Sequence, residues 1–320
     1  MASDRVLALD PRPESGKSAP VASIILDPKY LLSALIWGAL AVWAPASAAE
    51  TVTIARGAHL AAVAGCVACH TDAKAKSPPF AGGGPMKTPF GTFYAPNITP
   101  DQEHGIGRWS DIDFVRALRE GISPDGHHYF PVFPYTSYTN MTPEDARDIK
   151  AYLFSLKPVA RASRPHDIQF PFAWRFAQSF WKLLFFEPGP LGLQPEKSPE
   201  WNRGAYLVRA LVHCAECHTP RNPLGGMDRA LWLAGAPGGA QGDATPNITP
   251  DEKTGIGRWS AEEIVGYLES GMDPDGDFAG SSMAEVIEHS TGKLSNEDRT
   301  AITAYLRSIP AIRHKQSPTR

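Results

Sequence analysis

Two short cysteine motifs hold the residues of this sequence that are best suited to chemistry. Each has two cysteines separated by two residues and followed directly by a histidine: Cys66, Cys69 and His70, and then Cys214, Cys217 and His218. Two thiols three positions apart on a tight helical turn can reach both vinyl groups of one porphyrin, and the next imidazole then falls on the iron as its proximal ligand. The pattern therefore predicts two covalently attached haem c groups, one at each motif.

Cysteine pairs with this spacing also occur in zinc sites and in redox-active dithiols. Three features favour haem instead: a histidine directly follows both pairs, the pairs lie too far apart for a zinc ribbon, and the N-terminus resembles an export signal. All four cysteines of the chain belong to the two motifs. None is therefore left for a disulfide framework or a lone nucleophile.

The sixth iron ligand of the second haem is expected further along the chain, on the loop before the last helix. Methionine is the first candidate for it, and Met283 lies in that loop. Met227 and Met272 are the alternatives, with core packing or loop filling as their simpler roles. We therefore predict Met283 as the axial ligand.

The corresponding ligand of the first haem cannot occupy the equivalent position, because Phe133 aligns with Met283. Met141 is our choice there. The competing ligands are His127, His128 and Met86, whose simpler role is that of solvated or packed loop residues. Methionine on iron would raise the reduction potential relative to a bis-histidine haem, so the choice bears on the direction of electron flow.

The chain contains an internal repeat, which indicates that one domain has been duplicated. Residues 96–101 and 105–110 recur as 246–251 and 255–260, with the same spacing between the blocks. The cysteine motifs and the segments 56–58 and 203–205 fall into the same register.

Each copy shows three helical patterns and no convincing alternation of a strand, so we predict an all-α fold. The first helix of each copy should cover about 54–64 and 202–212. Ser260 and Glu263 predict a capping box. The Pro- and Gly-rich loops between the helices are long for a compact domain unless a haem fills the core. Residues suited to cap the later helices are Ser110, Thr142, Ser260 and Ser295.

These patterns divide the chain into a first domain at 50–160, a linker at 161–198, a second domain at 199–313 and a polar tail at 314–320. The linker is rich in aromatic residues: Phe170, Phe172, Trp174, Phe176, Phe180, Trp181, Phe185 and Phe186. We interpret it as a linker with a short amphipathic helix packed between the domains. Docking on a partner subunit or on a membrane surface is the alternative.

Residues 1–49 have the pattern of a secretory signal peptide, with Lys17 and Lys29 ahead of an apolar run at 31–42 and small residues after it. The run is shorter than the ~20 residues of a spanning helix, so we expect cleavage near Ala49 or Glu50 rather than a retained anchor. The long charged region would also fit a start codon placed too far upstream. The protein is therefore expected in the periplasm, with membrane association left open.

Several other residues have roles that follow from this arrangement. Gly57 and Gly204 should let the first helix of each copy approach the last helix closely, against Tyr152 and Tyr305. Trp109 and Trp259 could pack against the porphyrin or only in the domain core. The haem propionates could have partners among four further residues, for which loop capping is the alternative: Arg108, Arg258, Asn97 and Asn247.

After the signal, the chain resembles the dihaem and multihaem cytochromes c that serve as cytochrome subunits of periplasmic alcohol, sugar and aldehyde dehydrogenases. The resemblance rests on Arg-Gly-Ala-Tyr-Leu at 203–207, on residues 214–219, on the repeated blocks and on Phe-Pro-Tyr-Thr-Ser-Tyr at 133–138. It implies two tandem cytochrome c-like domains. It also implies a catalytic partner subunit with a flavin, quinone or molybdenum cofactor, and a respiratory electron acceptor.

The sequence departs from that family in two respects. Members of the alcohol dehydrogenase type usually carry three haems and a C-terminal amphipathic membrane helix, whereas this chain has two motifs and ends in a polar tail. Members also commonly have Met-Pro-Tyr where this chain has Phe133-Pro134-Tyr135.

Two classes of function fit these features. The first is a non-catalytic electron-transfer subunit, and the second is an enzyme in its own right, such as a dihaem peroxidase or a thiosulfate-oxidising cytochrome. An enzyme of that kind needs an open iron position and dissimilar halves, so the close repeat favours the carrier. The formal net charge of −3 points neither to a nucleic-acid partner nor to an anionic membrane surface.

Overall fold

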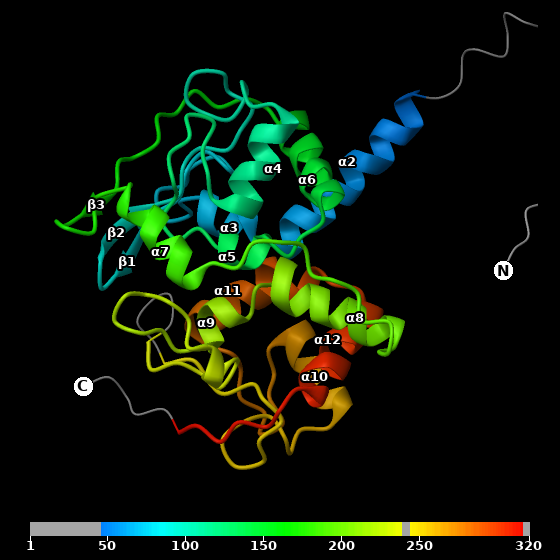
Figure 1. The fold of residues 1–320 in the computed structure, drawn as a ribbon. Helices are drawn as coiled ribbons and strands as arrows, with labels where there is room; N and C mark the ends of the chain where they lie inside the picture. Colours follow the sequence, from blue (N-terminus) through cyan, green and yellow to red (C-terminus); the bar gives the residue numbers. More distant parts are fainter. Residues whose placement is uncertain (1–45, 239–243, 316–320) are drawn as a thin grey trace, which may run out of the picture. The chain divides into compact units, whose positions relative to one another are not determined.

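The computed structural model describes residues 46–238 and 244–315, which are mostly helical (Figure 1). The N-terminal half contains α2 (Ala46–Val63), α3 (Cys66–His70), β1 (Pro85–Thr88), β2 (Gly91–Tyr94), α4 (Asp111–Glu120), α5 (Tyr135–Tyr138) and α6 (Pro143–Ser155). Next come β3 (Asp167–Ile168) and α7 (Ala177–Phe185). The C-terminal half contains α8 (Pro199–Tyr206), η1 (Leu207–Leu211), α9 (Ala215–His218), η2 (Arg229–Leu231), α10 (Ala261–Ser270), α11 (Ser281–His289), η3 (Thr291–Lys293) and α12 (Asn296–Ser308).

The N-terminal residues on which the export prediction rests lie largely outside the described residues. The expected cleavage position at Ala49 and Glu50 falls within α2. Among the described residues, no helix combines the length and the apolar character needed to cross a bilayer.

Side-chain caps define where α4 and α10 begin. The capping box predicted at Ser260 and Glu263 is confirmed, and Ser110 forms another with Asp113. In each box the serine hydroxyl accepts from the backbone N–H three residues on, while the carboxylate accepts from the N–H of the serine. Each box thus satisfies two of the donors that a helix N-terminus leaves unpaired. Thr142 and Ser295 cap α6 and α12 in the same way, as predicted.

Two glycines allow pairs of helices to approach closely, as the sequence predicted. A Cβ atom on Gly57 would lie 2.6 Å from the carbonyl carbon of Asp148 in α6 and 3.1 Å from Cβ of Tyr152. On Gly204 it would lie 2.5 Å from the carbonyl carbon of Ala301 in α12 and 2.9 Å from Cβ of Tyr305. Any larger residue would therefore force the helices apart.

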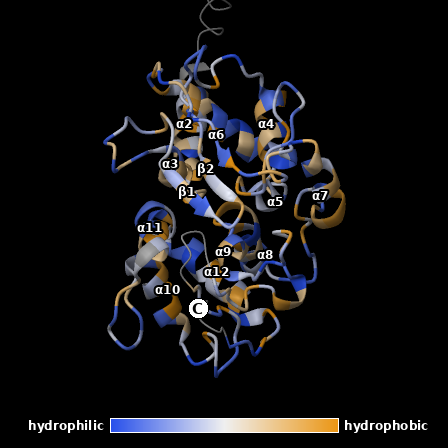
Figure 2. Ribbon diagram, turned by 90° about the vertical axis from the view of Figure 1, so that its left-hand side faces the viewer, coloured by the Kyte–Doolittle hydropathy of each residue, from blue (hydrophilic) through white to orange (hydrophobic). Residues whose placement is uncertain are grey.

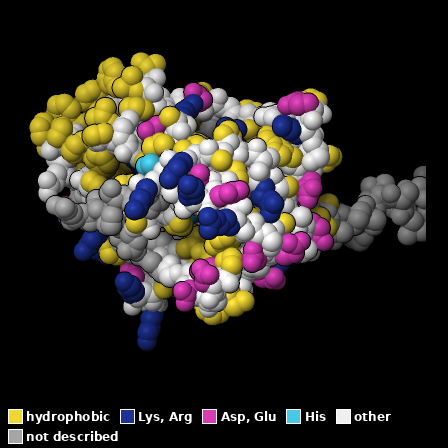
Figure 3. All heavy atoms as spheres, turned by 90° about the horizontal axis from the view of Figure 1, so that it is seen from below, with side chains coloured by type: hydrophobic (Ala, Val, Ile, Leu, Met, Phe, Trp, Pro, Cys, Tyr) yellow, Lys and Arg dark blue, Asp and Glu magenta, His cyan; other side chains and the backbone are white. Residues whose placement is uncertain are grey.

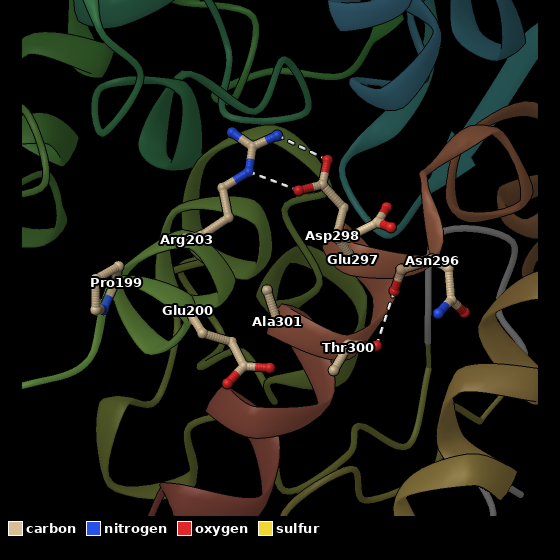
Figure 4. Close-up of a pocket in the computed structure, with 8 residues that line it drawn as sticks. All are labelled: Pro199, Glu200, Arg203, Asn296, Glu297, Asp298, Thr300 and Ala301. Atoms are coloured by element: carbon tan, nitrogen blue, oxygen red, sulfur yellow. Dashed lines mark hydrogen bonds and ion pairs between the residues drawn. The ribbon is translucent and has the colours of Figure 1, made fainter.

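An ion pair braces the contact between α8 and α12. Arg203 donates from Nε and one terminal nitrogen to the two carboxylate oxygens of Asp298, at 2.7 Å each. Figure 4 shows these side chains facing each other beside a surface pocket between the two helices. None of the residues that line this pocket belongs to a cysteine motif.

The helix before the second motif contains a π-helical turn. Gly57 precedes Cys66 by nine residues, whereas Gly204 precedes Cys214 by ten. The N-terminal half runs as α-helix to Val63, but the C-terminal half changes from α8 to the π-helix η1 at Leu207. Because a π turn takes up one more residue than an α turn, η1 absorbs the extra residue and keeps Gly204 at its contact with α12.

The prediction of an all-α fold without strands was wrong in one detail. Strands β1 and β2 form an antiparallel hairpin that pairs Pro85 with Tyr94 and Thr88 with Gly91, and β3 pairs with the outer edge of β2. Strands of four and two residues are too short for alternating hydrophobicity to show in the sequence. Strand β3, at 167–168, lies beyond the predicted first domain. The hairpin of that domain therefore pairs with a strand from the predicted linker.

Candidate functional site

The first cysteine motif forms its own short helix directly after α2. Gly65 adopts a left-handed conformation (φ 66°) that turns the chain from α2 into α3, and α3 consists of the five motif residues. In the second motif His213 takes the corresponding position, also at positive φ (47°). A non-glycine residue rarely adopts this left-handed conformation. That His213 does so indicates that the chain must turn at this position to enter the second motif.

Both motif histidines are oriented by a hydrogen bond from the ring. Nδ1 of His70 lies 2.7 Å from the carbonyl oxygen of Pro96, and Nδ1 of His218 lies 2.8 Å from that of Pro246. A carbonyl oxygen only accepts, so each Nδ1 carries the hydrogen and each Nε2 keeps its lone pair for a metal. Burial lowers the pKa of both imidazoles, which favours this neutral form.

Pro96 and Pro246 are functional residues that the sequence analysis did not identify. A signal for them was present, because both begin the repeated Pro-Asn-Ile-Thr block. Asn97 and Asn247 next to them serve the loop itself: each side-chain oxygen accepts from the following threonine, and each amide donates to a backbone carbonyl beyond the last helix of its half. The loop-capping interpretation of the two asparagines is thus confirmed.

The pKa values of three motif thiols are shifted upward. Burial raises the pKa of Cys66 and of Cys214 to about 12. Burial, and after it the charge of Cys217, raises the pKa of Cys69 to about 11. A redox-active or nucleophilic cysteine has a lowered pKa instead. The direction of these shifts is therefore opposite to that of an activated dithiol.

A zinc site would need further ligands beside each cysteine pair. Within 46–238 and 244–315, no three side chains among His, Cys, Asp and Glu come together as ion ligands. The potential donors in each motif are two thiols and one oriented imidazole, which is the set that haem c uses.

Met141 is fully buried and belongs to the same apolar cluster against which Cys66 packs. It stands directly before Thr142, the N-cap of α6.

The competing candidates for the first axial ligand lie in other surroundings. His127 is exposed, Met86 lies in β1, and Nδ1 of His128 is buried without a hydrogen-bond partner. Phe133, the counterpart of Met283, packs edge-on against the rings of Tyr129, Tyr135 and Tyr138.

Met283 lies on α11, so its predicted position on a loop was wrong. The run from Ser282 to His289 contains no proline or glycine and forms a helix once Gly280 has turned the chain. Met283 is half-buried, whereas Met272 is 51% exposed after the C-cap Gly271. Met227 is partly buried against the core.

The fold brings the two motifs together, which the sequence did not predict. Contacts between the two halves lie directly beside both motifs. The hydroxyl of Tyr138 donates to the carbonyl of Ala64 at 2.9 Å, and its ring lies edge-on to His213 with centroids 5.5 Å apart. Tyr138 therefore contacts the chain just before each motif, at Ala64 and at His213.

Further hydrogen bonds cross between the halves at the same place. The hydroxyls of Thr136 and Ser137 donate to one carboxylate oxygen of Glu216, at 2.7 and 2.6 Å, and Arg221 pairs with the other oxygen. Glu216 lies inside the second motif, between Cys214 and Cys217. The hydroxyl of Ser290, at the end of α11, donates to the carbonyl of Val63 at the end of α2.

The family model for cytochrome c matches residues 54–157. A dihaem cytochrome c-type protein of Cereibacter sphaeroides is 46% identical to this chain over 260 residues, which cover 80% of this chain and 86% of the relative. This chain belongs to the cytochrome c family. Members of the family hold haem c covalently and transfer electrons through it.

Two further relatives are subunits of larger enzymes. The fructose dehydrogenase cytochrome subunit of Gluconobacter japonicus is 42% identical over 83% of this chain. The cytochrome c subunit of the quinone-type alcohol dehydrogenase of Gluconobacter oxydans is 39% identical over 84%. The chain spans 54% and 57% of the length of these two relatives.

Proposed function

We propose that this protein is a dihaem c-type cytochrome that accepts electrons from a periplasmic dehydrogenase and passes them to a respiratory acceptor. The observation that carries the proposal is the matching geometry of the two motifs. Each joins two cysteines on one helical turn to a histidine whose Nδ1 is bonded to a proline carbonyl.

Two haem-binding domains, at 50–160 and 199–313, are joined by the linker at 161–198 and followed by the tail at 314–320. Corresponding features support this division: the capped helices α4 and α10, the close contacts of Gly57 and Gly204, and the bonded histidines. Residues 1–49 act as the export signal, which places haem attachment outside the cytoplasm.

The motif residues have distinct roles in holding haem. The two thiols of each motif would hold haem through thioether bonds to its vinyl groups, an addition that needs no external oxidant. His70 and His218 would offer Nε2 to the iron, and Met141 and Met283 would be its other protein ligands.

Bound haem supplies a one-electron couple at each site, and the protein sets the path between the two sites. Tyr138, His213 and Glu216 hold the motifs against each other, as the hydrogen bonds and ring contact between the halves indicate. Short separation favours direct transfer from one site to the other. Electrons can therefore enter through one half and leave through the other.

A dehydrogenase catalytic subunit is the proposed partner, of flavin, quinone or molybdenum type. Relatives named as cytochrome subunits of fructose, alcohol and gluconate dehydrogenases support this assignment. Of the two function classes that the sequence left open, these relatives favour the electron carrier.

The test of the ligand set combines haem counting with spectroscopy on the purified, haem-loaded protein. The pyridine haemochrome should give two haems per chain, and replacing both cysteines of one motif by alanine should leave one. Met141→His and Met283→His should each weaken the methionine–iron charge-transfer band of the oxidised protein. Met272→His is the matched control and should leave that band unchanged.

Two low-spin haems that do not react with peroxide or thiosulfate would support the carrier. A high-spin haem that binds peroxide readily would contradict it and would make the first domain an active site. A band that keeps its full intensity in Met141→His would reassign the first axial ligand, with His128 as the next candidate.

A further inference from the structure

The segment before and within α7 exposes a continuous row of large apolar side chains. This apolar face consists of Phe170, Trp174, Phe176, Phe180, Leu183 and Leu184. Its four aromatic rings follow one another with centroid separations of 5.2, 5.4 and 6.3 Å. Leu183 is 81% exposed and Phe170 is 73% exposed. Soluble proteins rarely present such a surface without a partner.

The views of the molecule agree with this description. Figure 2 shows α7 as a largely apolar helix at the edge of the molecule. Figure 3 shows hydrophobic side chains gathered at one edge, on the side where Figure 1 places α7 and β3. The hydrophobic surface is thus concentrated rather than scattered.

The polar groups of this segment point away from the apolar face and into the protein. Nζ of Lys182 donates to the carbonyls of Glu120 and Gly121, at 2.5 and 2.9 Å, at the C-terminal end of α4. Nε1 of Trp181 donates to the carbonyl of Leu224 at 2.8 Å. The guanidinium of Arg175 lies over the ring of Phe130 at 5.2 Å.

These inward contacts hold α7 in place and leave no charged side chain on its outer side. A buried lysine is unfavourable unless its ammonium is bonded, and here the ammonium donates to two carbonyls at the end of α4. Trp181 and Lys182 attach α7 to different halves of the chain. The orientation of the apolar face is therefore part of the folded structure.

The chemistry of the face suits a lipid bilayer better than a protein. Protein interfaces carry about one hydrogen bond per 100–200 Å² and mix polar groups with apolar ones, whereas acyl chains need none. Residues 170–186 contain no acidic residue. Residues 161–186 contain four basic residues and one acidic residue, Asp167. Lys182 is buried against α4 and Arg175 lies over Phe130, so the basic side chains left for a membrane surface are those of Arg161 and Arg164.

We propose that the apolar face of α7 and the residues before it docks the protein on an anionic membrane surface. The aromatic and leucine side chains enter the interfacial region of the bilayer, and Arg161 and Arg164 lie level with the lipid phosphates. The two haem motifs are then held at a constant distance from the membrane, which places the cytochrome where lipid-soluble electron acceptors reside.

The experiment uses the full-length, haem-loaded protein with vesicles of phosphatidylethanolamine and phosphatidylglycerol. Hydrogen–deuterium exchange of backbone amides is read peptide by peptide, so that any binding by the N-terminal apolar run is distinguished from binding by α7. The vesicles should slow exchange in residues 170–186 and leave the peptide that contains Ile112 unchanged. Neutral phosphatidylcholine vesicles should protect 170–186 less.

Matched variants test the face itself. Leu183→Ser and Leu184→Ser should each weaken vesicle affinity roughly tenfold, since burying a leucine side chain is worth somewhat more than the free energy of a tenfold change. Ile112→Ser is the control, because Ile112 is 77% exposed on α4, outside the face. Far-ultraviolet circular dichroism and the haem spectrum confirm that each variant is folded.

Three results would overturn the proposal. Wild-type protein that shows no protection of 170–186 would exclude membrane contact at this face without any variant. Equal effects of Leu183→Ser and Ile112→Ser would show that binding does not depend on the face. Leucine variants that bind vesicles normally but no longer co-purify with a dehydrogenase subunit would assign the face to a protein partner.

Discussion

Replacing Gly204 by alanine tests how strictly the helix pair beside the second motif is packed. The new Cβ atom would lie 2.5 Å from the carbonyl carbon of Ala301 and 2.9 Å from Cβ of Tyr305, and closer still to the Ala301 carbonyl oxygen. The atoms it meets are mainly backbone, which cannot rotate away. Helices α8 and α12 must therefore separate, and the Arg203–Asp298 ion pair that spans them must adjust.

The expected loss of stability combines two opposing terms. Alanine favours a helix interior over glycine by about 1 kcal/mol. Overpacking costs about 1–3 kcal/mol where side chains can adjust, and a clash with backbone lies at or above the upper end of that range. The net effect should be a loss of about 2 kcal/mol or more, or a fall in Tm of roughly 4–8 °C for a domain of this size.

Thermal unfolding of the haem-loaded protein, followed by far-ultraviolet circular dichroism at one scan rate, measures this loss. Gly266→Ala is the matched control, because Gly266 lies inside α10 and its new Cβ would meet nothing within 4 Å. The control should keep or slightly raise Tm. Gly57→Ala should behave like Gly204→Ala. If Gly204→Ala and Gly266→Ala had the same Tm, the close-packing argument would be wrong.

Three further outcomes follow from individual contacts. Burial lowers the pKa of Lys182 from 10.5 to about 8, so between those pH values the unfolded chain binds more protons than the folded protein. The free energy of unfolding of the wild type, measured by denaturant titration, should therefore rise with pH relative to that of Lys182→Met, by at most about 3 kcal/mol. A difference between the two proteins that does not change with pH would contradict this. Glu216→Gln removes a negative charge between the motifs and should raise the reduction potential in a spectroelectrochemical titration, while Thr136→Val should not. Ser260→Ala removes the cap of α10 and should cost about 1 kcal/mol in the same unfolding assay.

Much of the local structure could be predicted from the sequence, because it depends on neighbours along the chain. Ser110 and Ser260 cap the N-termini of α4 and α10 through capping boxes with a residue three positions on. Thr142 and Ser295 cap α6 and α12 in the predicted way. The close contacts of Gly57 and Gly204 were also predictable, since a glycine at the same place in both repeats indicates a position where a side chain would not fit.

Other features were not predictable, because their partners are distant in sequence. Strand β3 pairs with a hairpin more than seventy residues earlier, and Lys182 finds its two carbonyls at the end of α4. The linker composition suggested a packed helix, but not that its lysine would point inward and leave the outer side apolar. Met283 was expected on a loop because the helical pattern around it is short.

The sequence by itself determined the chemistry of this protein: Cys66, Cys69, Cys214 and Cys217, each pair followed by a histidine, specify covalent haem through spacing along one helical turn. Only the tertiary structure decided how these groups are arranged. It bonds His70 and His218 to proline carbonyls, brings the two motifs together and exposes the apolar face of α7. The physical reason is the distance along the chain between the residues involved. The spacing of the two cysteines and the histidine is set within five residues, whereas the orientation of the histidines and the proximity of the two motifs depend on contacts between segments that only folding brings together.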